Sequence, residues 1–155
     1  MIQENFYTFR NLIEKTNNHL TPCEEDYIEM IYRINLTTNL PVRVNDLANK
    51  LNVKPPSVTK MIKKLNTKNI IEFKKYKHIY LSNKGLEIGK FLINRHNTVE
   101  KFLKLLNADV NYTYETEKIE HTLNNEILSK LNFLVKFFES NDILLKKFHD
   151  FYRNY

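Results

Sequence analysis

The sequence predicts a mainly α-helical protein with one short β-hairpin, and three observations support this fold class. Only two of the 155 residues are glycine, which indicates short connections between helices. Over most of the chain, apolar residues recur at spacings of three and four, as they do on the buried face of a helix. The exception is the region 70–81, where β-branched and aromatic residues form two short runs typical of strands.

The composition indicates a globular chain rather than a membrane or secreted protein. Hydrophobic residues make up 42% and charged residues 27%. No apolar stretch approaches the roughly 20 residues that span a bilayer, and residues 1–20 contain Glu4 and Glu14 instead of the apolar core of a secretory signal. A single cysteine, Cys23, excludes an intrachain disulfide. We therefore expect a cytoplasmic location and no membrane partner.

Two helices are expected at the start of the chain. Four apolar residues recur at helical spacing within an N-terminal extension, residues 1–20: Ile2, Phe6, Phe9 and Ile13. Thr21 and Pro22 then form a helix start, with threonine as the N-cap and proline at the first helical position. The helix should run to about Leu36, and its apolar face carries Tyr27, Ile31 and Ile34.

A pair of short helices across a tight turn is expected within residues 44–66. Their apolar residues are Ala48, Leu51 and Val53, followed by Val58, Ile62 and Leu65. Pro55 and Pro56 suit the first turn of the second helix, where no intrahelical N–H is required. This is a helix-turn-helix pattern, and the helix from Pro55 to about Asn66 occupies the recognition position.

The two β-rich runs, 70–73 and 79–81, predict a two-stranded hairpin with a basic and aromatic tip, the wing of a winged helix. From Lys50 to His78 the chain carries nine lysines and one acid, Glu72. Such a density of positive charge indicates binding to double-stranded DNA, although a solvated lysine-rich face and a protein-binding winged helix are alternatives. The side chains expected to contact DNA are Pro56, Ser57, Thr59, Lys60, Lys63, Lys64, Lys74, Lys75 and Lys77.

The rest of the chain predicts further helices. A long helix should begin near Lys84 with Ser82 as its cap, and the last third carries apolar residues at helical spacing. So much apolar surface on short helices needs a second layer, which a second copy of the chain would supply. We therefore expect an N-terminal winged helix-turn-helix domain with a two-stranded wing at 21–90, followed by an all-helical dimerisation domain at 91–155.

Acidic and histidine side chains at helical spacing predict a divalent metal site. The candidate ligands are Asp26, Glu29, His96, Glu117, Glu120 and His121. Four carboxylates and two imidazoles suit a hard or borderline ion such as Mn²⁺, and the run from Glu117 to His121 should stack three ligands within one helical turn. Helices are rich in glutamate, so surface groups are the alternative. Four neighbouring acids are interpreted as solvent-exposed: Glu24, Glu25, Glu100 and Glu115.

A dinuclear metallohydrolase would use a similar set of ligands. No Gly-rich loop, nucleophile elbow or cleft-forming α/β pattern accompanies them in the sequence. We therefore expect a regulator rather than an enzyme, with no catalytic residues.

Five motifs occur in order along the chain: Tyr27-Ile28-Glu29-Met30-Ile31-Tyr32, Pro56-Ser57-Val58-Thr59-Lys60-Met61, Leu81-Ser82-x-Lys84-Gly85, Arg95-His96 and Glu117-x-x-Glu120-His121-x-Leu123. Together they resemble the diphtheria toxin repressor family, and most of all its manganese transport regulator branch, from about Pro22 to Glu139. The resemblance implies a homodimeric winged-helix repressor that binds a palindromic operator, controls metal-transport genes and uses metal as corepressor. It also implies that the six candidate ligands bind about two Mn²⁺ ions per chain, bridged by Glu117 and Glu120.

The resemblance distinguishes two branches and leaves some alternatives open. In the iron-responsive branch, Met and Cys usually stand at the positions of Asp26 and Glu117, so carboxylates here favour Mn²⁺. Substitution by Fe²⁺, Co²⁺, Cd²⁺ or Zn²⁺, an iron- or zinc-responsive regulator, and a metal-independent winged-helix regulator are the alternatives. The chain departs from the family in residues 1–20, in having no room for an SH3-like domain, in Thr113 at an ancillary histidine position, and in His78 in the wing.

Overall fold

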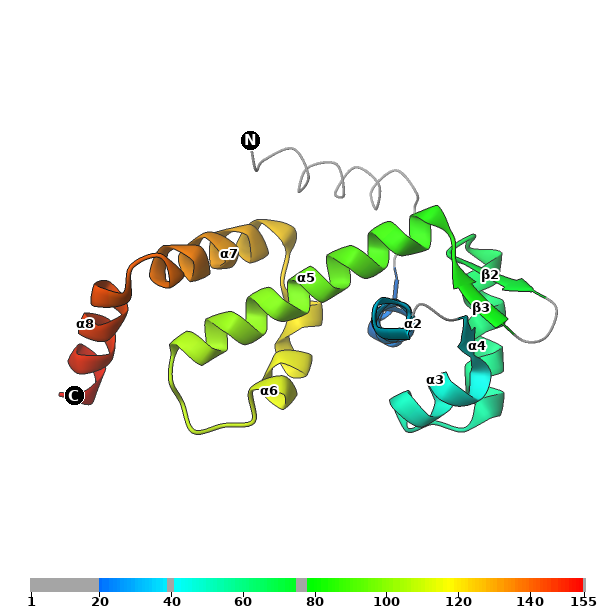
Figure 1. The fold of residues 1–155 in the computed structure, drawn as a ribbon, viewed down its shortest axis with the longest axis horizontal. Helices are drawn as coiled ribbons and strands as arrows, with labels where there is room; N and C mark the ends of the chain where they lie inside the picture. Colours follow the sequence, from blue (N-terminus) through cyan, green and yellow to red (C-terminus); the bar gives the residue numbers. More distant parts are fainter. Residues whose placement is uncertain (1–19, 39–40, 75–77, 155) are drawn as a thin grey trace. The chain divides into compact units, whose positions relative to one another are not determined.

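A computed structural model describes residues 20–38, 41–74 and 78–154 of the chain (Figure 1). The chain divides into two compact units, Met1–Ile93 and Asn94–Tyr155, and the boundary falls within helix α5 (Asn83–Leu105). The expected N-terminal helix and the wing-tip residues Lys75 and Lys77 lie outside the described residues. None of the described helices is long and apolar enough to cross a lipid bilayer.

The first unit is the predicted winged helix-turn-helix. Its elements, before the first part of α5, are α2 (Pro22–Thr38), β1 (Val42–Arg43), α3 (Val44–Leu51), α4 (Pro55–Thr67), β2 (Ile71–Lys74) and β3 (His78–Leu81). Strands β2 and β3 pair antiparallel with Ile71 opposite Leu81, which confirms the two-stranded wing. The sequence did not predict β1, which pairs antiparallel with β3 and makes the sheet three-stranded in the order β1-β3-β2.

The turn between α3 and α4 depends on one residue in the left-handed conformation. Asn52 has φ 53° and ψ 44°, and the N–H of the following Val53 donates to the carbonyl of Ala48 at 3.0 Å. Asparagine tolerates this conformation better than most residues, so it ends α3 without a glycine. Pro55 and Pro56 then begin α4, as the sequence predicts.

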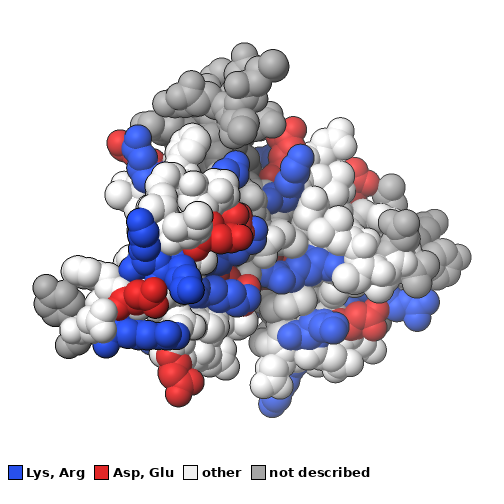
Figure 2. Space-filling model, turned by 60° about the vertical axis from the view of Figure 1, so that its left-hand side comes forward, with Lys and Arg blue, Asp and Glu red and all other residues white. Residues whose placement is uncertain are grey.

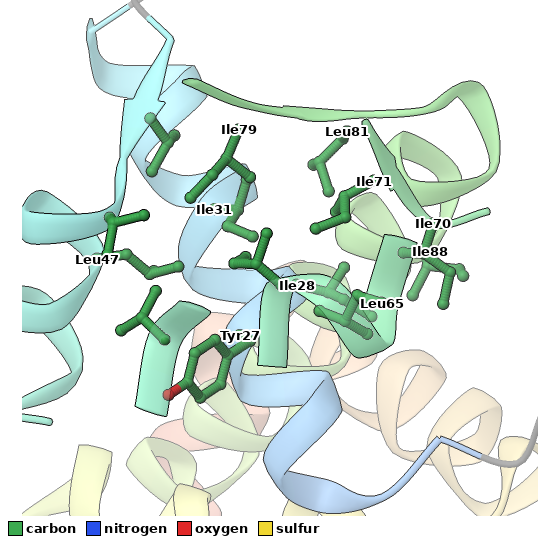
Figure 3. Close-up of a cluster of buried hydrophobic side chains, with 14 of the residues drawn as sticks. Tyr27, Ile28, Ile31, Leu47, Leu65, Ile70, Ile71, Ile79, Leu81 and Ile88 are labelled. Atoms are coloured by element: carbon green, nitrogen blue, oxygen red, sulfur yellow. The ribbon is translucent and has the colours of Figure 1, made fainter. Parts of the chain in front are cut away.

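The core of the first unit collects apolar side chains from α2, α3, α4, the sheet and the first part of α5 (Figure 3). Its fully buried members include Ile28, Ile31, Leu47, Ile62, Leu65 and Ile79. Gly89 allows α5 to approach α2, because a Cβ there would lie 2.7 Å from the Cβ of Tyr32. A side chain at Gly85 would likewise overlap the carbonyl oxygen of Ile70. The first turn of α5 therefore packs directly against the segment that joins α4 to β2.

Every regular element among the described residues of the second unit is an α-helix or a 3₁₀ turn, as predicted. After the end of α5 it contains α6 (Tyr112–Ile119), the 3₁₀ turn η2 (Glu120–Thr122), α7 (Asn125–Glu139) and α8 (Asp142–Arg153). Asn111 and Asn124 cap α6 and α7 by accepting backbone N–H groups at 3.1 and 2.8 Å. Helix α8 is anchored to the rest of the unit through His149, whose Nε2 lies 2.8 Å from the carbonyl oxygen of Leu105.

Candidate metal centre and DNA-reading surface

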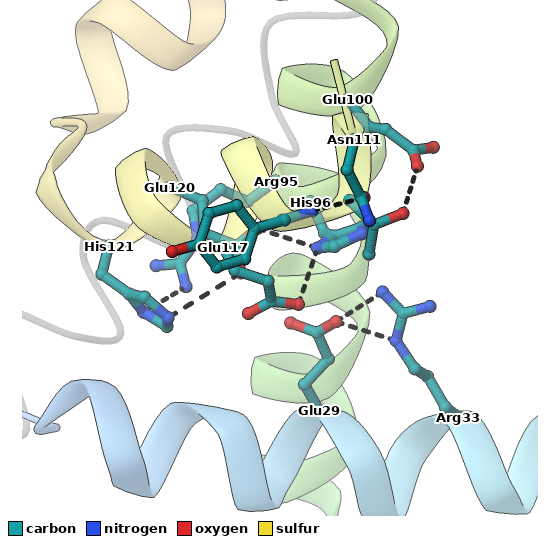
Figure 4. A network of polar contacts seen from close by, with 11 residues as sticks. Glu29, Arg33, Arg95, His96, Glu100, Asn111, Glu117, Glu120 and His121 are labelled. Atoms are coloured by element: carbon teal, nitrogen blue, oxygen red, sulfur yellow. Dashed lines mark hydrogen bonds and ion pairs between the residues drawn. The ribbon is translucent and has the colours of Figure 1, made fainter. Parts of the chain in front are cut away.

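Four of the six expected metal ligands come together within the second unit (Figure 4). His96 projects from α5, and its Nδ1 lies 3.0 Å from Oε2 of Glu120 and 3.7 Å from Oε1 of Glu117. Nε2 of His121 lies 3.8 Å from Oε1 of Glu120. Glu120 therefore stands between two imidazoles, and the four side chains converge although α5 and η2 are separated by the whole of α6.

The expectation that one helical turn carries Glu117, Glu120 and His121 is wrong in detail. Helix α6 ends at Ile119, and Glu120 and His121 lie in η2. A 3₁₀ turn is tighter than an α-helix and is common at helix ends, where the last carbonyls lack intrahelical partners. The hydroxyl of Thr122 donates to one of these, the carbonyl of Ile119, at 2.7 Å.

The cluster is largely shielded from water. His96 and Glu120 are 5% and 1% exposed, whereas the side chain of Glu117 is 51% exposed. Oε2 of Glu120 accepts no well-directed hydrogen bond from the described residues, although Nδ1 of His96 lies 3.0 Å away. A buried carboxylate oxygen without a donor is costly, and a cation would relieve that cost. The donors are all oxygen and nitrogen, so the cluster fits a hard or borderline divalent ion.

Arg95 contacts the cluster through His121. The sequence indicated Arg95 only through its place in a family motif. The Arg95 guanidinium is 5% exposed, and its Nη2 lies 3.1 Å from Nδ1 of His121. Because a guanidinium only donates hydrogen bonds, Nδ1 accepts this one. The bond orients the His121 ring with Nε2 toward Glu120. Because a neutral imidazole has only one free lone pair, a metal ion bound by either ring nitrogen would replace the Arg95 bond.

The other two expected ligands, Asp26 and Glu29, lie in the first unit on helix α2. They are three residues apart and so share one face of the helix. Oε1 of Glu29 accepts hydrogen bonds from Nε and Nη2 of Arg33, at 2.8 and 2.6 Å (Figure 4). Arg33 is therefore a counterion to an expected ligand. Its i,i+4 spacing from Glu29 is the sequence signal that could have indicated the pair.

Two of the acids interpreted as solvent-exposed, Glu100 and Glu115, have specific partners within the second unit. The side chain of Glu100 is 22% exposed, and it accepts hydrogen bonds from Lys104 at 2.8 Å and Thr113 at 3.1 Å. The Lys104 bond, together with that of Thr113, lowers the pKa of Glu100. Thr113, which stands at an ancillary histidine position of the family, thus bonds within the protein. Glu115 pairs with Lys118 at 2.7 Å near the surface.

Glu24 contradicts the expectation of exposure outright, since it is completely buried. Its Oε1 lies 2.6 Å from Nζ of Lys68 and 3.3 Å from Nζ of Lys64. Burial by itself would raise the pKa of Glu24, but hydrogen bonds from Lys68, the Thr21 backbone and Lys64 lower it to about 2. This contact could not be predicted from the sequence, because the lysines follow Glu24 by about forty residues along the chain.

The recognition helix α4 presents most of its expected DNA contacts to solvent. The exposed members are Pro56, Ser57, Lys60, Lys63 and Lys64. Thr59 is half-buried, and its hydroxyl donates to the carbonyl of Pro55 at 3.1 Å, so only its lone pairs remain for a ligand. Lys74 belongs to β2, and Lys75 and Lys77 lie outside the described residues.

The chain has 24 lysine and arginine residues against 18 acidic ones, which gives a net charge of +6. On the face drawn in Figure 2, lysine and arginine side chains are interspersed with acidic ones rather than gathered into a single field. Mixed charge of this kind favours solubility. Helix α4 differs, because its sequence contains exposed lysines and no acidic residue, so its charge is positive only.

Two known domain families match consecutive parts of the chain. Residues 19–79 match the family described as iron dependent repressor, N-terminal DNA binding domain. Residues 82–143 match the iron dependent repressor, metal binding and dimerisation domain. Helix-turn-helix, wing and carboxylate–imidazole cluster thus define a metal-dependent DNA-binding regulator.

The chain is also similar to known regulators over most of its length. It is 39% identical over 127 residues to the HTH-type transcriptional regulator MntR of Listeria monocytogenes serotype 4a, covering 81% of this chain and 89% of that protein. The structure of the manganese regulator SloR superposes with a TM-score of 0.65 at 28% identity, covering 76% of this chain and 55% of that one. The crystal structure of ScaR with bound Zn²⁺ gives a TM-score of 0.62 at 27% identity, covering 74% and 54%.

The chain belongs to the iron-dependent repressor family. It is a helix-turn-helix transcriptional regulator of the MntR type, in which a DNA-binding domain precedes a metal-binding and dimerisation domain. The chain spans about half the length of the solved SloR and ScaR structures that it matches.

Proposed function

We propose that the chain is a manganese-responsive repressor that binds a palindromic operator as a homodimer when Mn²⁺ is bound. The observation that carries the proposal is the convergence of His96 and Glu120, two buried ionisable groups 3.0 Å apart, in a domain of a metal-binding family. Buried ionisable groups that lie this close together are candidates for a functional site.

We propose that six side chains hold the metal: Asp26, Glu29, His96, Glu117, Glu120 and His121. The four that converge in the second unit supply carboxylate oxygens and imidazole nitrogens. Since none of the six is a thiolate or thioether, Mn²⁺ is favoured over softer ions at this set, and carboxylate bridging suits about two ions per chain. Zn²⁺, which ScaR binds, is a possible substitute together with Fe²⁺, Co²⁺ and Cd²⁺.

A bound divalent ion would supply positive charge that neutralises the clustered carboxylates and links the segments that carry them. The chain's own residues do the rest. Arg95 orients His121 until His121 binds metal, and η2 holds Glu120 between the two imidazoles. Arg33 neutralises Glu29 when the metal is absent. Metal can favour DNA binding only as far as it favours the conformation that binds DNA.

Recognition of DNA is assigned to α4 and the wing. Ser57 and Thr59 lie in the first turns of α4, where short side chains reach base edges or phosphates, while Lys60, Lys63 and Lys64 neutralise phosphates. Lys74, Lys75 and Lys77, expected at the wing tip, would add contacts to an adjacent groove or to the DNA backbone. Operator binding should therefore weaken steeply with salt.

A second copy of the chain is the proposed cover for the apolar faces of α7 and α8. Large apolar side chains remain exposed there: Ile127, Phe133, Leu134, Phe137, Ile143, Leu144, Phe151 and Tyr152. Large apolar side chains left exposed in such numbers mark an interaction site. Two copies related by a twofold axis would present two α4 helices to the half-sites of a palindrome.

The experiment that tests the proposal starts with a random-sequence library of DNA duplexes. The chain selects duplexes from the library in Mn²⁺, and the affinity for the selected duplex is then measured in Mn²⁺ and in chelator. We expect tight binding in Mn²⁺ that chelator abolishes, and enriched sequences that are palindromic. Equal affinity in both conditions would instead identify a metal-independent winged-helix regulator. Stronger activation by Fe²⁺ or Zn²⁺ than by Mn²⁺ would identify an iron- or zinc-responsive regulator instead.

A further inference from the structure

We propose that Glu24 is a positioning residue that couples metal binding on helix α2 to the placement of the recognition helix α4. The inference rests on the proposed function, because it concerns how the metal signal reaches the DNA-reading side chains. Glu24 is not among the expected metal ligands or DNA contacts. It is nevertheless a completely buried carboxylate at the start of the helix that carries Asp26 and Glu29.

The two oxygens of Glu24 have separate tasks. Oε2 accepts the backbone N–H of Thr21 at 2.8 Å, and Oγ1 of Thr21 accepts the N–H of Glu24 at 3.3 Å. This reciprocal pair is a capping box, which fixes the first turn of α2. Oε1 binds two ammonium groups, with Lys68 at 2.6 Å and Lys64 at 3.3 Å. One side chain therefore both begins α2 and holds the C-terminal end of α4.

Both lysines lie at the C-terminal end of α4, so their contact with Glu24 depends on the position of that helix. Lys64 belongs to the last turn of α4, and Lys68 follows directly as its C-cap residue. Asp26 follows Glu24 by only two residues on α2. A shift of the metal-bearing part of α2 therefore moves the Glu24 carboxylate, and the carboxylate pulls on the end of the helix that presents Lys60 and Lys63.

An ionic link sets the register of two helices more sharply than apolar packing does. Ile28 of α2 and Ile62 and Leu65 of α4 belong to one buried cluster, but apolar burial is non-directional and tolerates small displacements. A buried carboxylate 2.6 Å from an ammonium is satisfied in one arrangement, and separation would leave an uncompensated charge. The link is thus suited to transmit a small movement of α2.

The test compares DNA affinity in Mn²⁺ and in chelator for the full chain and its variants. The probe is the duplex selected from the random library by the unmodified chain. Glu24→Gln keeps the volume of the side chain and an oxygen that can complete the capping box, but it removes the charge. We expect the ratio of the two affinities to fall on the order of tenfold. Mn²⁺ affinity without DNA should stay close to that of the unmodified chain.

Two further variants separate coupling from mere stability. Glu25→Gln removes the same charge one position along α2, where the side chain is half-buried, and should leave the ratio unchanged. Lys68→Gln removes the closer partner and should lower the ratio as Glu24→Gln does. If circular dichroism shows that Glu24→Gln does not fold, the ratio of Lys68→Gln decides.

The outcomes that overturn the inference differ from those that overturn the proposed function. If Glu24→Gln weakens DNA binding equally in Mn²⁺ and chelator, the ratio is unchanged and Glu24 is only structural. If the unmodified chain itself binds the duplex equally in both conditions, the proposed function is wrong, and the inference falls with it. Thermodynamic reciprocity gives a second readout, because DNA should tighten Mn²⁺ binding by the same factor in each variant.

Discussion

The imidazole of His96 and the carboxylate of Glu120 face each other at 3.0 Å, both almost excluded from water. They belong to different elements, α5 and η2, so their contact fixes one against the other within the second unit. His121 and Glu117 extend the cluster to either side of Glu120. This arrangement concentrates negative charge and imidazole nitrogens at one place, where a divalent cation would be more favourable than water.

Replacement of Glu120 should remove the metal response without unfolding the chain. Glu120→Gln preserves the shape of the buried side chain but removes its charge, so we expect Mn²⁺ affinity to fall by at least about a hundredfold. DNA binding in Mn²⁺ should fall to the level seen in chelator. Titration calorimetry and a DNA-binding assay check both effects. Glu115→Gln, at a surface acid paired with Lys118, is the matched control. Full Mn²⁺ activation of Glu120→Gln would contradict the assigned site.

Replacement of Lys60 should separate DNA binding from metal binding. Lys60 is exposed on α4 and is not among the residues assigned to the metal. Lys60→Ala should weaken binding to the selected duplex, and the slope of log affinity against log salt concentration should decrease by about one. Mn²⁺ affinity measured without DNA should not change. A parallel loss of Mn²⁺ affinity would show that the two functions are not divided as proposed.

Removal of Arg33 should tighten metal binding. Its guanidinium binds Oε1 of Glu29 and places a positive charge beside an expected ligand. Arg33→Gln should raise Mn²⁺ affinity by about threefold, a small factor because a partly exposed ion pair contributes under about 1 kcal/mol. Arg43→Gln removes an exposed arginine of the same unit and serves as control. Weaker Mn²⁺ binding by Arg33→Gln would mean that Arg33 instead holds Glu29 in its binding position.

The stability of the chain should depend on Glu24 in a pH-dependent manner. Its pKa is lowered from 4.5 to about 2, so the ionised form favours the folded state. The contribution is therefore fully present above about pH 5 and is lost as the pH falls toward 2. At pH 7, Glu24→Gln should decrease the free energy of unfolding by on the order of 2–3 kcal/mol. Urea unfolding of both chains at pH 7 and pH 3 measures this difference, and an equal difference at both values would contradict the ion pair.

Periodicity and local signals were enough to predict most of the fold. The proline pair at 55–56 marks the start of α4, and Ser82 caps α5, where its hydroxyl accepts the N–H of Gly85 at 3.1 Å. Strand β1 was missed because Val42–Arg43 is too short to show a period and exists only by pairing with β3. The η2 turn was missed because α and 3₁₀ turns place similar residues at similar spacing.

The candidate site was predictable in composition but not in its supporting contacts. Ligand type and helical spacing indicated His96, Glu117, Glu120 and His121 before their convergence was known. The partners of these residues, and the burial of Glu24, depend on contacts between segments far apart in the chain. A glutamate in the first helical turn reads as solvated by default, and only the fold places Lys64 and Lys68 beside it.

The most direct test of metal sensing is a calorimetric titration of Mn²⁺ into the chelator-stripped chain, with His96→Ala measured in parallel. We predict saturable binding of about two ions per chain, which is lost or halved in His96→Ala because Nδ1 of the His96 imidazole lies 3.7 Å from Glu117 and 3.0 Å from Glu120. Absence of saturable Mn²⁺ binding to the unmodified chain, or unchanged binding by His96→Ala, would contradict the assignment of this cluster as the metal sensor.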